Sequence, residues 1–68
     1  MAVKKVIEIM ASSPKSWEDA TANAVNSAGK TLKGIKSVYV NHMSAVVKDN
    51  KISEYRINVK ISFDVLNE

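Results

Sequence analysis

The sequence contains no cysteine and only one histidine, His42, among its 68 residues. The lack of cysteine excludes disulfide bonds and cysteine-based zinc sites. A chain this short hides only about 60% of its unfolded surface when it folds alone. Small domains compensate with disulfides, metals or oligomerisation. Because the sequence has no residues for disulfides and few for metal sites, we expect the protein to be stable as an oligomer.

Long apolar runs are also missing. No stretch approaches the roughly 18 apolar residues of a membrane span, and the N-terminal residues do not resemble a signal peptide. We therefore expect a cytoplasmic protein that does not bind membranes. The formal net charge is +3, but the 10 Lys and Arg residues are spread along the chain and mixed with acidic residues. This distribution disfavours nucleic-acid binding, which needs a basic surface.

The known catalytic and ion-binding motifs are absent as well. The run Gly29-Lys30-Thr31 resembles the end of a phosphate-binding loop, but position 24 is an alanine where that loop needs a glycine. His42 has no partner for zinc or triad chemistry that the sequence identifies. The acidic residues lack the alternate spacing of an EF-hand loop, although a calcium site shared between subunits stays open. The sequence indicates a binding protein and not an enzyme.

The first half of the chain predicts a strand followed by a helix. Over residues 3–12 an extended chain places Val3, Ile7, Ile9 and Ala11 on one face with Lys5, which favours a strand, and Pro14 separates this segment from the next. The hydroxyl of Ser16 can cap the free N–H groups at a helix start, and the carboxylate of Asp19 can accept a hydrogen bond from the backbone N–H of Ser16, as in a capping box. Apolar residues recur at helical spacing and predict a helix over residues 17–33. These residues are Trp17, Ala20, Ala24, Val25, Ala28 and Leu32.

The second half predicts two long strands. Gly34 suits the left-handed residue after a helix end. Residues 35–48 are rich in β-branched side chains and predict a strand, the polar residues 49–51 predict a turn, and residues 52–66 predict the last strand. In this last strand the odd-numbered residues from Tyr55 onward are apolar and the even-numbered residues are polar. The two strands should therefore form a hairpin with one buried face.

The order of these elements predicts an α+β fold in which residues 1–68 form a single βαββ domain. We expect a three-stranded antiparallel sheet with the strand order 2-3-1 and one helix on one face. The middle strand has apolar residues at both odd and even positions, which include Ile35, Val38, Tyr39, Val40 and Met43. One helix cannot cover two apolar faces, so the second face should contact another subunit or a ligand.

Two aromatic residues could belong to either the core or a site. Trp17 shares the apolar stripe of the helix, so we expect it to pack in the core of the subunit. Tyr39 lies on the face that the helix is not expected to cover. Its position is equally consistent with packing at an interface and with contact with a ligand.

Four segments of the chain resemble the dodecin family, and together they span almost its whole length. They are Val6 to Ile9, Ser13 to Ala20, Lys30 to Leu32 and Tyr55 to Phe63. The resemblance implies a dodecamer of cubic symmetry with flavin sites between subunits.

The site residues implied by this resemblance differ from those of flavin-binding dodecins. Ser37 stands where those proteins carry a tryptophan that stacks on the flavin ring, and Arg56 stands where a glutamine hydrogen-bonds the flavin edge. Ser44 and Asp64 stand where arginines meet phosphate in some members. The run from Ser13 to Glu18, combined with the lack of a strand tryptophan, resembles the branch called calcium dodecins.

Two main functional hypotheses follow, and a third, electrostatic binding of nucleic acid, is kept because the net charge is +3. The first is a homododecameric, dodecin-like binding or storage protein that sequesters a small planar ligand, with flavin (riboflavin or FMN) inherited from the family. The ligand-binding residues would be Ser37, Tyr39, Arg56 and Ser44. The alternative is a flavin-poor shell with a calcium-binding or structural role.

Overall fold

The computed structural model describes residues 3–65 and contains one helix and three strands in that range. The order is β1 (Val3–Ser13), α1 (Trp17–Gly29), β2 (Ile35–Lys48) and β3 (Lys51–Val65). The βαββ order and the bounds of β2 agree with the sequence analysis. The predicted end of the last strand near Leu66 lies outside the described residues.

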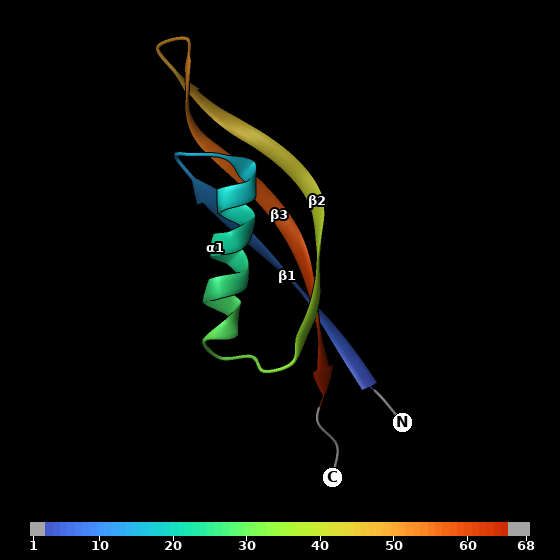
Figure 1. Ribbon diagram of the computed structural model, residues 1–68. Coiled ribbons are helices and arrows are strands. Elements are labelled where there is room, and N and C mark those ends of the chain that lie inside the picture. Colours follow the sequence, from blue (N-terminus) through green and yellow to red (C-terminus); the bar gives the residue numbers. More distant parts are fainter. Residues whose placement is uncertain (1–2, 66–68) are drawn as a thin grey trace.

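The sheet is antiparallel, with β3 between β1 and β2, which confirms the predicted strand order. Figure 1 shows α1 lying along one face of the twisted sheet, while the hairpin of β2 and β3 extends beyond the start of the helix. Over residues 3–65, no helix is long and apolar enough to cross a membrane.

The core lies between the helix and the central strand. Its buried residues are Ala20, Ala24, Ile57, Val59 and Ile61. The two alanines let the helix backbone approach the sheet closely, and the alternate residues of β3 fill the space beneath them. Ile7 and Ile9 of β1 and Ile35 and Val38 of β2 pack around this centre and are partly buried. The predicted buried face of the last strand is therefore confirmed.

The start of the helix is fixed by two serines. Ser16 is the N-cap residue, and its hydroxyl accepts a hydrogen bond from the Asp19 N–H at 2.9 Å, as predicted. The Asp19 carboxylate accepts from the hydroxyl of Ser13 at 2.6 Å, where a capping box would direct it to the Ser16 N–H. Ser13 is 1% exposed, and its hydroxyl also accepts from the Lys15 N–H at 2.9 Å. The junction between β1 and α1 is thus held by a satisfied buried hydroxyl.

The helix ends earlier than predicted, at Gly29 and not at residue 33. Glycine is a poor helix former because its backbone loses much freedom when ordered. The chain then tightens, since the N–H groups of Lys30 and Thr31 each donate to the carbonyl three residues earlier, that of Ser27 and of Ala28. Gly34 has the expected positive φ, 76°, but it lies in the link before β2 and not at the helix end.

Irregular pairing in β2 changes the faces that simple alternation predicts. The register with β3 skips Lys36 and Asn41, so each is an extra residue that reverses the alternation. Val38 and Val40 consequently share the helix-covered face with Ile61 and Val59, their partners in register. The prediction that they oppose Ile35 and Met43 is therefore wrong. Tyr39 lies on the opposite face, together with Lys60.

The hairpin between β2 and β3 closes with two residues and not with the predicted three. Lys48 pairs with Lys51, and Asp49 and Asn50 between them have φ angles of 52° and 62°. Two successive positive φ values are typical of the type I′ turn, whose twist matches that of the strands. Asn and Asp tolerate this left-handed conformation better than other residues that carry a side chain.

Candidate functional site

The sheet face turned away from α1, called the open face below, carries all four predicted ligand-binding residues. In β3 the odd-numbered residues Ile57, Val59 and Ile61 are buried under the helix, so the even-numbered residues face the other way. Residues paired in register share a face, which assigns the neighbouring strands too. The open face contains Lys4, Val6, Glu8, Met10 and Ser12 of β1, Ser37, Tyr39, His42, Ser44 and Val46 of β2, and Glu54, Arg56, Asn58, Lys60, Ser62 and Asp64 of β3.

The four predicted residues form two groups on this face. Ser37 and Tyr39 are paired with Ser62 and Lys60, while Ser44 is paired directly with Arg56. Along β3, 6 positions separate Ser62 from Arg56 and 4 separate Lys60 from Arg56, so at roughly 3.3 Å per residue Ser37 is about 20 Å and Tyr39 about 13 Å from the second group. One subunit therefore does not bring all four residues together.

The first group combines two hydrogen-bonded serines with an exposed aromatic ring. The hydroxyls of Ser37 and Ser62 are hydrogen-bonded to each other, and Val6 is the β1 partner of Ser62. Tyr39 is 64% exposed, a large value for an aromatic side chain. A flat ligand could contact its ring, and such contacts favour offset or edge-to-face geometry.

Asp64 closes this end of the open face with an ion cluster that spans the three strands. Its carboxylate is 2.7 Å from the Lys4 Nζ and 3.8 Å from the Lys36 Nζ. The hydrogen bond from Lys4 holds the pKa of Asp64 below its usual value, and the charge of Lys36 adds to the effect. Lys4 and Lys36 thus already contact a carboxylate, which makes this end a poor phosphate site.

The second group lies beside a hollow of about 200 Å³ that sequence reasoning missed. We call it the Arg56 hollow, and it is lined by Met10, Ala11, Ser12, Glu54 and Arg56. The Arg56 Nη2 is 3.4 Å from the Glu54 Oε1. The pKa of Glu54 is below its usual value, first because the Ser12 hydroxyl donates to its carboxylate and then because of Arg56. The sequence did carry a signal for this pair, because Glu54 and Arg56 are two positions apart in a strand and such residues share a face.

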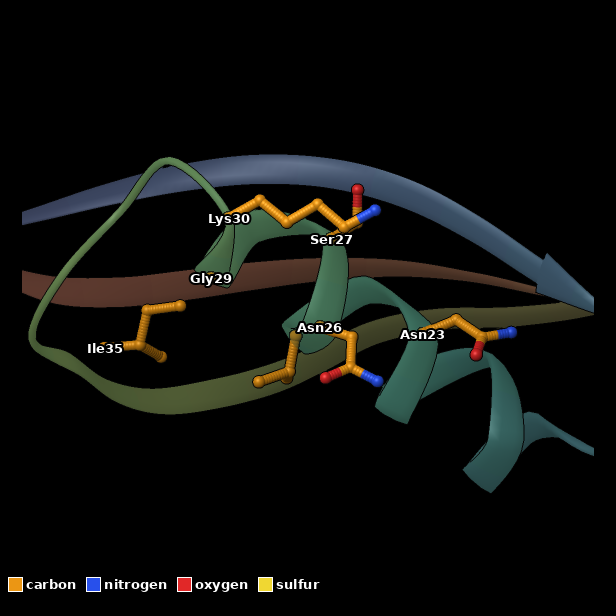
Figure 2. A pocket seen from close by; sticks show the side chains of 7 residues that line it. Asn23, Asn26, Ser27, Gly29, Lys30 and Ile35 are labelled. Atoms are coloured by element: carbon orange, nitrogen blue, oxygen red, sulfur yellow. The ribbon is translucent and has the colours of Figure 1, made fainter.

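A larger groove lies beside the helix and contains none of the predicted residues. It has a volume of about 690 Å³ and is lined by Asn23, Val25, Asn26, Ser27, Gly29, Lys30 and Ile35. Figure 2 shows the polar side chains along α1 and Ile35 across the groove at the start of β2. The groove forms because the helix packs mainly over β1 and β3. It lacks an acidic side chain and an aromatic ring, so it fits neither predicted ligand.

Trp17 packs against the core, as predicted, but it is only partly buried. Its ring meets Tyr55 edge to face, with centroids 4.9 Å apart and planes at 77°. The indole Nε1 donates to the Ser44 carbonyl at 2.9 Å. The side chain therefore links the start of the helix to β2 and β3, on the opposite side of the sheet from the open face.

The donors for a metal ion are scattered. Within residues 3–65, no group of three or more His, Asp and Glu side chains could hold a metal ion. His42 is exposed on the open face, paired in register with Asn58. The calcium hypothesis therefore finds no cluster of carboxylates within the described part of one subunit.

Comparisons with known proteins converge on one family. Residues 3–66 match the family described as Dodecin. The calcium dodecin of Mycobacterium tuberculosis is 38% identical over 63 residues, which cover 93% of this chain and 89% of that protein. Its crystal structure, described as having a calcium-binding site, matches with a TM-score of 0.82 at 37% identity and covers 97% of this chain and 94% of that chain.

A dodecin from Streptomyces coelicolor matches with a higher TM-score, 0.93, but only 22% identity, and covers 98% of this chain and 96% of that chain. Backbone similarity and sequence identity thus rank the two relatives differently. At 22% identity the likeness supports the fold alone, so the mycobacterial protein is the better guide to side chains.

Proposed function

Because the chain belongs to the dodecin family, we propose that it assembles into a homododecameric shell that binds and stores a small ligand and catalyses no reaction. The observation that carries this proposal is the exposed apolar surface of the subunit. Large apolar side chains are at least 38% exposed on both faces of the sheet: Val3, Val6, Met10, Tyr39, Val40, Met43, Val47 and Ile52. Such surface usually marks an interaction site.

The edges of the sheet support the same proposal. Within the described residues, β1 and β2 each pair with a strand on one side only. Unpaired edges expose backbone groups that natural proteins cover or protect. A shell of subunits would cover them and complete a core that a chain of this size cannot build alone. Light scattering should give the mass of about twelve subunits, and a folded monomer at micromolar concentration would refute the shell.

We infer that the ligand is planar, with flavin (riboflavin or FMN) as the first candidate, and that it contacts Ser37, Tyr39, Ser44 and Arg56 from more than one subunit. The exposed ring of Tyr39 and the small residues around Ser37 support a flat ligand. Riboflavin fits better than FMN, because Lys4 and Lys36 already pair with Asp64.

Substitution at Ser37 tests the flavin proposal. Stacking of a planar ring on an aromatic side chain contributes about 1 to 3 kcal/mol in nucleic-acid complexes, or roughly one to two decades of affinity. We expect wild-type protein to bind riboflavin weakly, and Ser37→Trp to bind it more tightly with stronger quenching of flavin fluorescence. Equal affinity of the two proteins in a fluorescence titration would contradict this account of Ser37.

Calcium is the second candidate, favoured by the 38% identity to a protein named calcium dodecin. Since the donors of a single subunit are scattered, the ion would need carboxylates from neighbouring subunits. Calorimetric titration of the assembled protein with Ca²⁺ tests this candidate, with Mg²⁺ as the control, because calcium accepts more ligands and a looser geometry. Heat of binding that is equal for both ions, or absent, would argue against a calcium site.

A further inference from the structure

A bulge in β2 places the single histidine of the chain, His42, near the centre of the open face. The register with β3 skips Asn41, so Asn41 and His42 together stand opposite Asn58. The Asn41 Nδ2 donates to the Asn58 Oδ1 at 3.4 Å, and His42 is exposed beside this pair. Because Asn58 carries no charge, His42 has no acidic side chain opposite it.

The other charged side chains on and beside the open face are arranged as neighbours of opposite sign. They are Lys4 and Lys36 with Asp64, Lys60 with Glu8, and Arg56 with Glu54. These four cations and three carboxylates nearly balance. The face can therefore meet the same face of a second copy without strong repulsion, as a self-complementary contact requires. A protonated His42 would be an additional positive charge without a partner.

The nearest charged neighbours of His42 are themselves positive. Arg56 and Lys60 lie on either side of Asn58 in β3, and diagonal neighbours in a sheet are roughly 7 to 8 Å apart. The remaining neighbours on the open face are Glu8, Met10 and Ser12 of β1 and Tyr39 and Ser44 of β2. Of these only Glu8 is charged near neutral pH, and it stands directly opposite Lys60. The helix α1 covers the other face and adds no group here.

We propose that protonation of His42 weakens the contact between subunits on the open face, so that the assembly dissociates more readily as the pH falls. This inference rests on the proposed function, because it assigns the cover of the open face to a second copy of the chain. Met10 and Tyr39, which are 72% and 64% exposed, lie beside His42. A subunit that covers them also removes His42 from water, which costs more for the charged ring than for the neutral ring.

The direction of the pH effect follows from this cost. Histidine gains its proton between about pH 5 and 8, whereas carboxylates titrate near pH 4 and lysine and arginine above about pH 10. Assembled subunits should bind fewer protons at His42 than separated subunits do. The contact should therefore be strongest above about pH 7 and weaken below about pH 6, by up to about tenfold per pH unit for each proton.

The test compares wild-type protein with two variants at about pH 8 and about pH 5.5, on either side of the range in which histidine titrates. Sedimentation over a series of protein concentrations gives the concentration at which half of the assembly dissociates. For wild type this concentration should rise at least about tenfold at the lower pH. His42→Gln, which is polar but uncharged, should change by less than about threefold. His42→Lys, which carries the charge at both pH values, should assemble weakly at both.

Each outcome has a defined meaning. If wild type keeps its mass at the lower pH, or if His42→Gln dissociates with the same pH dependence, the inference is wrong and the shell stands. Assembly of His42→Lys as tight as that of wild type at the higher pH would also overturn it. A wild-type protein that is a folded monomer at the higher pH would instead refute the shell. Circular dichroism of every sample distinguishes dissociation from unfolding.

Discussion

Replacing Trp17 tests whether this side chain stabilises the subunit or serves a ligand. The ring is partly buried against the core, meets Tyr55 at 4.9 Å, and donates to the Ser44 carbonyl. The pair with Tyr55 lies on the side of the sheet opposite the open face, and the bond to Ser44 involves its backbone carbonyl and not its side chain. We therefore expect Trp17→Ala to lower stability and Trp17→Phe to separate the hydrogen bond from the packing.

The magnitude follows from the contacts. Deleting a large aromatic side chain from a core costs about 3 to 5 kcal/mol. Because Trp17 is only partly buried, we expect the lower end, about 3 kcal/mol. The edge-to-face pair accounts for about 1 kcal/mol of it. Trp17→Phe keeps most of the packing but loses the bond to the exposed Ser44, whose carbonyl can bind water, so its cost should be about 1 kcal/mol.

Urea unfolding followed by circular dichroism measures both variants, with all proteins at the same concentration because the proposed assembly would contribute to stability. A cost of 3 kcal/mol corresponds to a fall in melting temperature of about 12 to 24 °C for a domain of this size. The expected order is wild type, Trp17→Phe, Trp17→Ala. If Trp17→Ala keeps its melting temperature but loses a bound ligand, Trp17 is a site residue and this reasoning is wrong.

Three further changes test the fold. Ile61→Ala, at a fully buried position, should cost about 3 kcal/mol in urea unfolding, and a cost below 1 kcal/mol would argue against the assigned core. The pKa of Asp64 is lowered in the folded protein, so the ionised carboxylate should stabilise the fold above about pH 4, the pKa of this group in the unfolded chain. This stabilisation should decline as the pH falls through the pKa of the folded protein. Asp64→Asn should make stability depend less on pH in this acidic range, which urea unfolding at a series of pH values would reveal. Asn50→Ala, at a φ of 62°, should cost about 1 kcal/mol, whereas Asn50→Gly should keep the melting temperature.

The element order and the buried face of β3 could be predicted because several local signals agree. From Tyr55 to Val65 every second residue is apolar, and the structure buries the centre of that set under the helix. Ser16 marked the helix start correctly. The helix end was overestimated because the apolar spacing continues to Leu32, while the chain leaves the helix at Gly29. Spacing alone does not report the cost of a glycine at a helix end.

The faces of β2 could not be predicted, because an extra residue in a strand leaves no clear mark in composition. Lys36 and Asn41 are ordinary strand residues in the sequence, yet each reverses the alternation that follows. Tyr39 was correctly left without helix cover, whereas Ile35 and Met43, which simple alternation places on the face of Tyr39, lie on the helix-covered face. The Glu54–Arg56 pair was missed because the sequence analysis considered Arg56 alone.

The spacing of the candidate residues links ligand binding to assembly. Ser37 and Arg56 lie about 20 Å apart on one subunit, farther than one small planar ring can span, so a site that uses both must take them from different subunits. A ligand in such a site binds the assembled protein and not the separated subunit, and it therefore stabilises the assembly by mass action. The same reasoning covers calcium, since residues 3–65 of one subunit do not group enough acidic donors for an ion. Under either hypothesis the functional unit is the interface between subunits, and the open face of each chain supplies only part of it.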